Sequence, residues 1–230
     1  MLLALHVHTD YSKCAESRIS DIKKYCVENN IGAIAICDHN LIEGALELEK
    51  IAENFKVIIG EEIKTKQGEI IGLFLKNKIE PFGTLSDTID KIKQQNGLVY
   101  LPHPFDIIRP FHMRWDTLFA NMKKIDIVEI FNSKMICHFN NVQAKIFASQ
   151  FNKIGAIGSD AHFVKAIGCA IMEIEDFDSP IDFLEKLKNA KIVSAVNMGV
   201  ATTLWSRIKK FFRVRFRLVR IILFRIINKK

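Results

Sequence analysis

The sequence lacks the cysteine patterns of disulfide-stabilised and zinc-finger proteins. Its five cysteines are odd in number and scattered, and no Cys-x-x-Cys pair occurs. This usage argues against a disulfide framework and predicts a reducing, intracellular compartment. A secretory signal is also lacking, because the apolar stretch at residues 1–5 is too short and no positive charge precedes it. We therefore predict a cytoplasmic protein whose first strand begins at the N-terminus.

Two motif absences narrow the chemistry. No Gly-rich phosphate loop of either common type is present, which argues against nucleoside-triphosphate and dinucleotide chemistry. No Gly-x-Ser-x-Gly elbow occurs, so a serine–histidine triad is unsupported. Acidic residues are also missing from residues 203–230, which hold ten basic side chains, whereas residues 1–202 hold 23 basic and 26 acidic ones. The net charge of +7 therefore comes from the C-terminal segment.

Strand and helix patterns alternate over residues 1–200, a length that suits one catalytic domain. Predicted strands cover residues 2–8, 31–37, 55–59, 69–75, 98–101, 125–130, 154–157 and 169–174. Predicted helices cover residues 20–27, 43–53, 85–95, 115–122, 140–152 and 180–189. The Lys-Gln-Gly turn at residues 66–68 indicates a hairpin. Six or seven strand–helix units favour a parallel α/β barrel over an open sheet.

Potential metal ligands follow the predicted strands. His6 and His8 stand two residues apart, and Asp160 and His162 repeat this spacing downstream. Alternate residues of a strand point the same way, so each pair can reach one ion. Further candidates at strand ends are Asp38, His39, Glu62 and His103. Clustered His, Asp and Glu side chains would repel or remain unsatisfied without a metal, so we predict a multinuclear metal site.

These motifs, in this order, resemble those of the PHP (polymerase and histidinol phosphatase) superfamily over roughly residues 1–200. The family pattern has an HxH pair, a DH, a Gly-x-Glu, a later His-Pro and a final Gly-Ser-Asp-x-His. The matching residues are His6, His8, Asp38, His39, Glu62, His103, Asp160 and His162. The resemblance implies a distorted (β/α)7 barrel that holds two or three divalent ions, manganese, iron or zinc, and hydrolyses phosphate esters.

The resemblance also implies which residues share an ion, with Glu62 as a bridge. The implied sets are His6, His8, Glu62 and Asp160 for the first ion, His103 and His138 with Glu62 for the second, and His39 and His162 for the third. His138 follows its strand end by several residues, and a surface histidine at a helix start is the alternative reading.

The third ion site departs from the family pattern. Cys14 stands where some members place a histidine, and a thiolate is a competent ligand for zinc or iron. Glu16 is the alternative ligand, and a small buried loop cysteine is the structural alternative. Asp38 is predicted to hold a ring nitrogen or a metal-bound water, or to be a direct ligand.

The predicted reaction is hydrolysis of a phosphorylated small molecule or a nucleotide. Carboxylate-bridged ions activate water and clamp the oxygens of an in-line displacement, so Glu62 and Asp160 are the predicted catalytic carboxylates with Asp38 beside them. Arg109, six residues after the His-Pro histidine, is predicted to bind substrate phosphate. Arg114 and Lys165 are further candidates, or solvated surface cations. A nuclease on short oligonucleotides and a non-catalytic PHP module are the alternatives.

The C-terminal tail, residues 203–230, is basic and rich in Phe and Ile. Lys210, Arg213, Arg217 and Arg220 fall on one helical stripe, which suits an amphipathic helix on the anionic inner face of a membrane. Part of the segment also alternates strictly, as a strand does. Arginines interrupt the apolar run too often for a spanning helix. Packing onto the body or an oligomer partner, and contact with nucleic acid, are the other predictions.

Overall fold

The computed structural model describes residues 1–106 and 113–198. The strands are β1 (Leu2–Val7), β2 (Ile31–His39), β3 (Lys56–Thr65), β4 (Gly68–Leu73), β5 (Leu98–Leu101), β6 (Ile127–Asn132), β7 (Ile154–Gly158), β8 (Ala170–Glu173) and β9 (Lys191–Ala195). The helices are α1 (Ile19–Glu28), α2 (Glu43–Ile51), α3 (Leu85–Gln94), α4 (Trp115–Asn121), α5 (His138–Gln150) and α6 (Pro180–Leu187), with 3-10 turns η1 (Met122–Lys124) and η2 (Val164–Cys169). Arg109 and the predicted tail lie outside the described residues.

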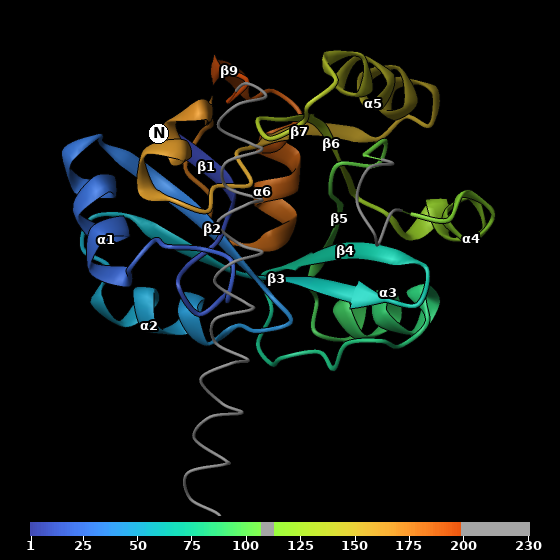
Figure 1. The fold of residues 1–230 in the computed structure, drawn as a ribbon, viewed down its shortest axis with the longest axis horizontal. Coiled ribbons are helices and arrows are strands. Elements are labelled where there is room, and N and C mark those ends of the chain that lie inside the picture. Colours follow the sequence, from blue (N-terminus) through green and yellow to red (C-terminus); the bar gives the residue numbers. More distant parts are fainter. Residues whose placement is uncertain (107–112, 199–230) are drawn as a thin grey trace, which may run out of the picture.

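The strands form one sheet that curls into a nearly closed barrel (Figure 1). Their order is β7-β6-β5-β4-β3-β2-β1-β8-β9. Neighbours pair in parallel except around β4, which is antiparallel to β3 and β5, and around β8, which is antiparallel to β1 and β9. The chain after β7 closes the barrel against β1, because Ala161 N donates to His6 O at 3.2 Å and His8 N donates to Ala161 O at 2.9 Å. The predicted distorted α/β barrel is confirmed.

Local sequence explains where several elements end. Asn30, Asn96 and Asn152 have φ angles of 53, 60 and 50°, and each stands two residues after α1, α3 or α5. Asparagine tolerates this left-handed conformation, which ends a helix and turns the chain into the next strand. Gly68 has a φ of 138°, which favours glycine, and the chain reverses there between β3 and β4. The predicted hairpin is confirmed.

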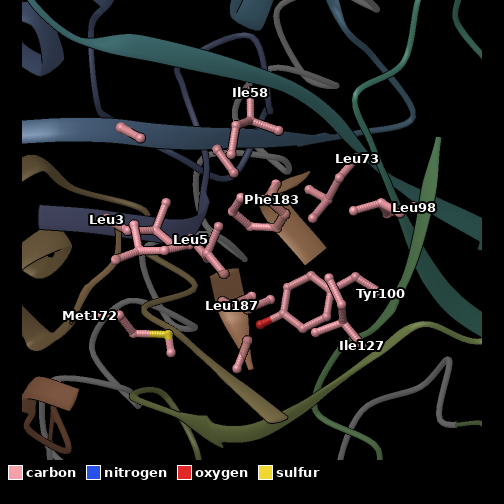
Figure 2. Close-up of a cluster of buried hydrophobic side chains, with 14 of the residues drawn as sticks. Leu3, Leu5, Ile58, Leu73, Leu98, Tyr100, Ile127, Met172, Phe183 and Leu187 are labelled. Carbon is pink, nitrogen blue, oxygen red and sulfur yellow. The ribbon is translucent and has the colours of Figure 1, made fainter. Parts of the chain in front are cut away.

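The barrel interior is filled with apolar side chains at its amino end (Figure 2). Leu3 and Leu98 stand at or near the start of their strands and belong to this cluster. Helix α6 adds Phe183 and Leu187, which are buried among them, and the Phe183 ring lies 4.9 Å from that of Phe177. Each such side chain contributes about 1.5–3 kcal/mol when buried. Because α6 closes this end of the barrel, the carboxyl ends of the parallel strands remain for polar side chains.

Helices cover the outer side of the barrel. Ala4 and Val7 of β1 cluster with Ile22 of α1 and Leu48 of α2, and these two helices lie together in Figure 1. The outward side chains of β4 and β5 cluster with α3 and α5 in the same way. Strands such as β1, β4 and β5 are therefore covered on both faces, which explains their near-continuous apolar sequences.

Strand β9 is the one described strand for which the sequence carried no recognisable signal. Its side chains are largely exposed, and it pairs with β8 at the edge of the sheet, so it has no inward apolar pattern. The other predicted strands and helices match described elements to within a few residues, except that β3 continues six residues past the predicted end at Ile59 and so includes Glu62. Among the helices within residues 1–106 and 113–198, none has the length and apolar character that crossing a membrane would require.

Candidate metal centre

Polar side chains converge at the carboxyl ends of the parallel strands. They come from β1, β2 and β3 and from the segments directly after β1, β5 and β7. We term them the ligand cluster: His6, His8, His39, Glu62, His103, Asp160 and His162. Most are fully buried, and the most exposed, His39, shows 16% of its side chain. The structure thus brings together these residues, which the sequence motifs singled out.

Glu62 lies at the centre of the ligand cluster. Its Oε1 is 2.9 Å from His103 Nε2 and 3.6 Å from His6 Nε2. Its Oε2 is 2.8 Å from His39 Nδ1 and 3.6 Å from His8 Nε2. One carboxylate therefore lies between two pairs of imidazoles, which is the position that a bridging ligand needs.

Asp160 is a second carboxylate with several imidazoles close to it. Its Oδ1 is 3.4 Å from His8 Nε2, 3.9 Å from His6 Nε2 and 3.3 Å from His162 Nδ1. Groups whose ligand atoms lie within 4.8 Å of one another are His6–His8–Asp160, His6–Glu62–His103, His8–His39–His162 and His39–Glu62–Glu69. These groups share members, so the ligand cluster can hold more than one ion. Glu69, on β4, did not stand out in the sequence.

Unusual backbone conformations aim several of these side chains. Leu5 faces the barrel interior, so an unbroken strand would turn His6 outward. Instead the pairing of β1 with β2 changes register after Ala4, and His6 adopts a φ of 59°, which turns its ring inward. His103 and Asp160 have φ angles of 27 and 49°. Positive φ in such residues costs about 1–3 kcal/mol each and concentrates at functional sites.

Glu129 on β6 is a buried carboxylate behind the ligand cluster. Its Oε1 accepts hydrogen bonds from His6 Nδ1 at 2.8 Å and Tyr100 OH at 2.9 Å. Its Oε2 accepts from His103 N at 2.7 Å and Asn132 Nδ2 at 2.9 Å. A proton on Nδ1 of His6 leaves the lone pair of Nε2 facing the ligand cluster, as in carboxylate–histidine–metal sites. The signal in the sequence was an acid inside the apolar run of β6.

Gly158, the last residue of β7, leaves room for this carboxylate. A Cβ atom there would stand 1.9 Å from Glu129 Oε1 and 2.9 Å from His6 Cβ. The glycine of the Gly-Ser-Asp-x-His motif is therefore needed for close approach rather than for backbone freedom.

Several buried atoms of the ligand cluster have no hydrogen-bond partner. They include His6 Nε2 and both ring nitrogens of His8, whereas His39 Nδ1 and Glu62 Oε2 face each other at 2.8 Å as an ion pair. Each unpaired buried polar atom costs about 1–3 kcal/mol, so this convergence fits a group that the chain itself does not supply. Imidazole and carboxylate donors suit divalent manganese, iron or zinc.

Electrostatics in the ligand cluster favour positive charge. Burial alone would lower the pKa values of His6 and His39. Surrounding carboxylates outweigh burial at His6 and hold its pKa well above the ordinary value, while Glu62 and the sulfur of Cys14 raise the pKa of His39 to about 10. The buried carboxylates of Glu62, Glu129 and Asp160 therefore attract positive charge, which divalent cations would supply.

Two imidazoles are kept neutral, as metal ligation requires. Burial, together with the nearby His39, lowers the pKa of His8 to about 3. Burial, together with the ammonium of Lys134, holds the pKa of His162 well below its usual range. Burial would raise the pKa of Glu62, but the charge of His39 and its neighbours outweighs burial and keeps this carboxylate ionised.

Asp38 contacts a loop rather than an imidazole. Its carboxylate accepts hydrogen bonds from Thr9 N at 2.8 Å, Thr9 Oγ1 at 2.6 Å and Ser12 Oγ at 2.5 Å. Ser12 Oγ accepts in turn from His39 N at 3.0 Å. These hydrogen bonds reach no ring nitrogen, and a role of Asp38 toward a metal-bound water stays a prediction. Asp38 ties the loop after β1 to the end of β2.

The remaining predicted site residues do not belong to the ligand cluster. His138 is the exposed first residue of α5 and joins none of the ligand groups found among the described residues, so its predicted pairing with His103 is not reproduced. Cys14 is half-buried, and hydrogen bonding to its sulfur helps raise the pKa of His39, next to the predicted third site. Arg109 lies outside the described residues.

Lys134, on the loop after β6, did not stand out in the sequence. Its Nζ lies 3.2 Å from Asp160 Oδ1 and 3.1 Å from His162 Nδ1. Of the cations that were predicted, Arg114 forms an exposed ion pair and Lys165 is exposed on η2. A lysine therefore reaches the ligand cluster from a loop that carries no recognised motif.

Comparison with known proteins fits this geometry. A sequence model of the family described as PHP-associated matches residues 138–192. An uncharacterized protein of Methanocaldococcus jannaschii is 37% identical over 200 residues, which cover 82% of this chain and 79% of that protein. The chain belongs to the PHP superfamily. This membership agrees with the barrel and with the order of the strand-end motifs.

Solved structures similar to this PHP chain share its fold. A two-domain protein of Bacteroides vulgatus, containing a predicted PHP-like metal-dependent phosphoesterase, has a TM-score of 0.67 at 15% identity over 85% of this chain. This PHP chain spans 65% of that protein's length. PsfC of Pseudomonas syringae has a TM-score of 0.61 at 14% identity, covering 94% of this chain and 98% of its own. At these identities the likeness concerns the fold.

Proposed function

We propose that this protein is a metal-dependent hydrolase that cleaves phosphate esters at the ligand cluster. The observation that carries the proposal is the convergence of buried imidazole nitrogens, several of them unpartnered, with buried carboxylate oxygens. Membership of the PHP superfamily and the phosphoesterase named for the Bacteroides neighbour support it. The proposed substrate is a phosphorylated small molecule or a nucleotide.

The proposed cofactors are two or three divalent ions of manganese, iron or zinc. The residues proposed to hold them are His6, His8, His39, Glu62, His103, Asp160 and His162, with Cys14 beside the third position. Bound ions would supply a water of lowered pKa and positive charge beside the phosphoryl oxygens.

The protein's own residues prepare this chemistry. Glu129 orients the His6 ring through Nδ1 and fixes the backbone after β5 through His103 N. Burial keeps His8 and His162 neutral, so their lone pairs remain available. Positions held in this way need little rearrangement when a substrate binds.

A nuclease acting on short oligonucleotides is the second candidate. The ten basic side chains of residues 203–230 favour a nuclease, because they would bind the backbone phosphates of a nucleic acid. The same ligand cluster would serve either reaction, so the substrate panel below separates the two candidates.

The test is turnover of phosphomonoesters, nucleotides and short oligonucleotides by the full chain reconstituted with manganese, iron or zinc. We expect metal-dependent release of phosphate or of shortened product. Asp160→Ala should lower kcat/KM by more than about 100-fold and reduce bound metal, because loss of an outer ligand partner alone costs 10- to 100-fold. Asp178→Ala, at an exposed side chain, is the matched control.

Three results would count against the proposal. Retained turnover in a folded Asp160→Ala protein would place the chemistry elsewhere. Equal losses in Asp160→Ala and Asp178→Ala would indicate a general folding effect. A wild-type protein that binds no metal and turns over no substrate would favour the non-catalytic PHP module.

A further inference from the structure

Lys134 brings a positive charge into the ligand cluster. Its side chain is only 11% exposed, and its ammonium group lies 3.2 Å from Asp160 Oδ1. The same nitrogen lies 3.1 and 3.4 Å from the two ring nitrogens of His162. A lysine with this little exposure is costly unless anions face it, so its placement requires an explanation.

The loop that carries Lys134 is fixed on several sides. Ser133 N donates to Gly158 O at 3.1 Å, and Ser133 Oγ donates to Ser159 O. Lys134 N donates to Asn132 Oδ1 at 3.0 Å, and Met198 N donates to Ser133 O at 2.8 Å. The lysine therefore extends from a backbone held against the end of β7, in the way that a preorganised binding group is held.

Charge then indicates the ligand. Asp160 is proposed to bind an ion, so an occupied site would place divalent positive charge close to the Lys134 ammonium. The single negative charge of Asp160 offsets only part of the repulsion between these cations. A phosphate group with two negative charges satisfies both, because its oxygens can face the ions and accept a charge-assisted hydrogen bond from Nζ.

We propose that Lys134 is a substrate-binding residue that holds the phosphate group and makes phosphomonoesters the preferred substrate class. This inference rests on the proposed function. A phosphomonoester carries up to two charges on three terminal oxygens, whereas a phosphodiester carries one charge on two terminal oxygens because a second oxygen is esterified. An additional ammonium group beside the ions therefore favours the monoester.

The first measurement is calorimetric binding of inorganic phosphate to the manganese-loaded full chain, with metal content determined for every variant. Lys134→Met should weaken phosphate binding by about 10- to 100-fold, which is the range for a lost charge-assisted hydrogen bond. Lys134→Arg should recover most of the affinity. Lys145→Met, on the exposed face of α5, is the matched control and should bind phosphate as the wild type does.

The second measurement compares kcat and KM for a phosphomonoester and a phosphodiester with the same leaving group. Lys134→Met should raise KM for the monoester and narrow the preference over the diester by a similar factor. Unchanged phosphate affinity, or an unchanged monoester-to-diester ratio, would overturn the proposal. A fall in bound metal equal to that of Asp160→Ala would also overturn it, because Lys134 would then support the ion site instead.

The two proposals can fail separately. A metal-loaded wild type that hydrolyses neither ester contradicts the proposed function, yet its phosphate affinity still tests Lys134. Hydrolysis of both esters with no effect of Lys134→Met leaves the hydrolase standing and removes Lys134 from the phosphate site.

Discussion

At the scale of single residues, Glu129 orients the His6 ring by accepting a hydrogen bond from its Nδ1. It contacts His6 Nδ1, His103 N, Tyr100 and Asn132, and leaves His6 Nε2 to face the other ligands. Such outer partners fix the tautomer and direction of a ligand histidine. The geometry of the ligand cluster thus depends on a carboxylate that the strand-end motifs do not include.

Glu129→Gln is therefore expected to weaken metal binding by about 10- to 100-fold, as losses of outer ligand partners do. The amide keeps the size of the side chain but presents a donor where an acceptor is needed. Metal affinity measured by competition with a chromogenic chelator would show the change. Glu173→Gln, at an exposed position on β8, is the control, and equal affinity in both variants would contradict the role given to Glu129.

At the scale of elements, the alternation of β3 separates two adjacent glutamates. Glu62 points into the barrel with Ile58, whereas Glu61 points outward on the same side as Ile63. Glu61 is fully buried, its Oε2 accepts from Ile79 N at 2.9 Å, and its Oε1 has no partner. Burial raises the pKa of Glu61 from 4.5 to about 7.

This shift predicts a pH dependence of stability. Between pH 4.5 and about 7 the folded chain holds the Glu61 proton while the unfolded chain releases it, so the free energy of unfolding falls as the pH rises through this window. Glu61→Gln should remove this dependence and be more stable than the wild type at pH 8, by up to about 3 kcal/mol, with little difference near pH 4.5.

Urea unfolding with a chelator present, at pH 4.5, 6 and 8, would measure this effect without contributions from bound metal. Glu49→Gln, at an exposed position on α2, is the matched control and should follow the wild type at every pH. A wild type and a Glu61→Gln variant whose stabilities change in parallel with pH would show that Glu61 stays ionised in the folded protein.

At the scale of the whole molecule, the barrel and the tail have separate predicted roles. The barrel carries the ligand cluster at one end and α6 at the other. The tail at residues 203–230 has ten basic side chains and no acid. We propose that the tail binds an anionic membrane surface and affects location rather than chemistry.

Removal of residues 202–230 should therefore abolish sedimentation with vesicles that contain phosphatidylserine and leave turnover of a soluble phosphomonoester unchanged. Replacing Arg213, Arg217 and Arg220 with glutamine should weaken vesicle binding by about 100-fold, at about 1 kcal/mol per basic residue. Neutral phosphatidylcholine vesicles are the control. Vesicle binding that persists without the tail would contradict the proposal, and binding to nucleic acid alone would favour the nucleic-acid alternative.

The strand-end ligands could be predicted because their signals are local. An apolar run ends where His, Asp or Glu begins, and parallel strands place such ends at one edge. His8, Glu62 and Asp160 needed no more than this rule. The signals that end helices are also local, because Asn30, Asn96 and Asn152 each adopt a left-handed backbone conformation that asparagine tolerates.

The tertiary structure decided what lies behind and beside these ligands. A register change and a positive φ, rather than simple alternation, turn His6 inward. Barrel closure brings Glu129 and Lys134 to the ligand cluster, whereas His138 lies exposed on α5. Sequence alone therefore determined which strand ends carry the clustered His, Asp and Glu side chains, because strand length and polarity are local properties. Only the closed barrel determined which other side chains meet them, because those contacts join residues far apart in the chain.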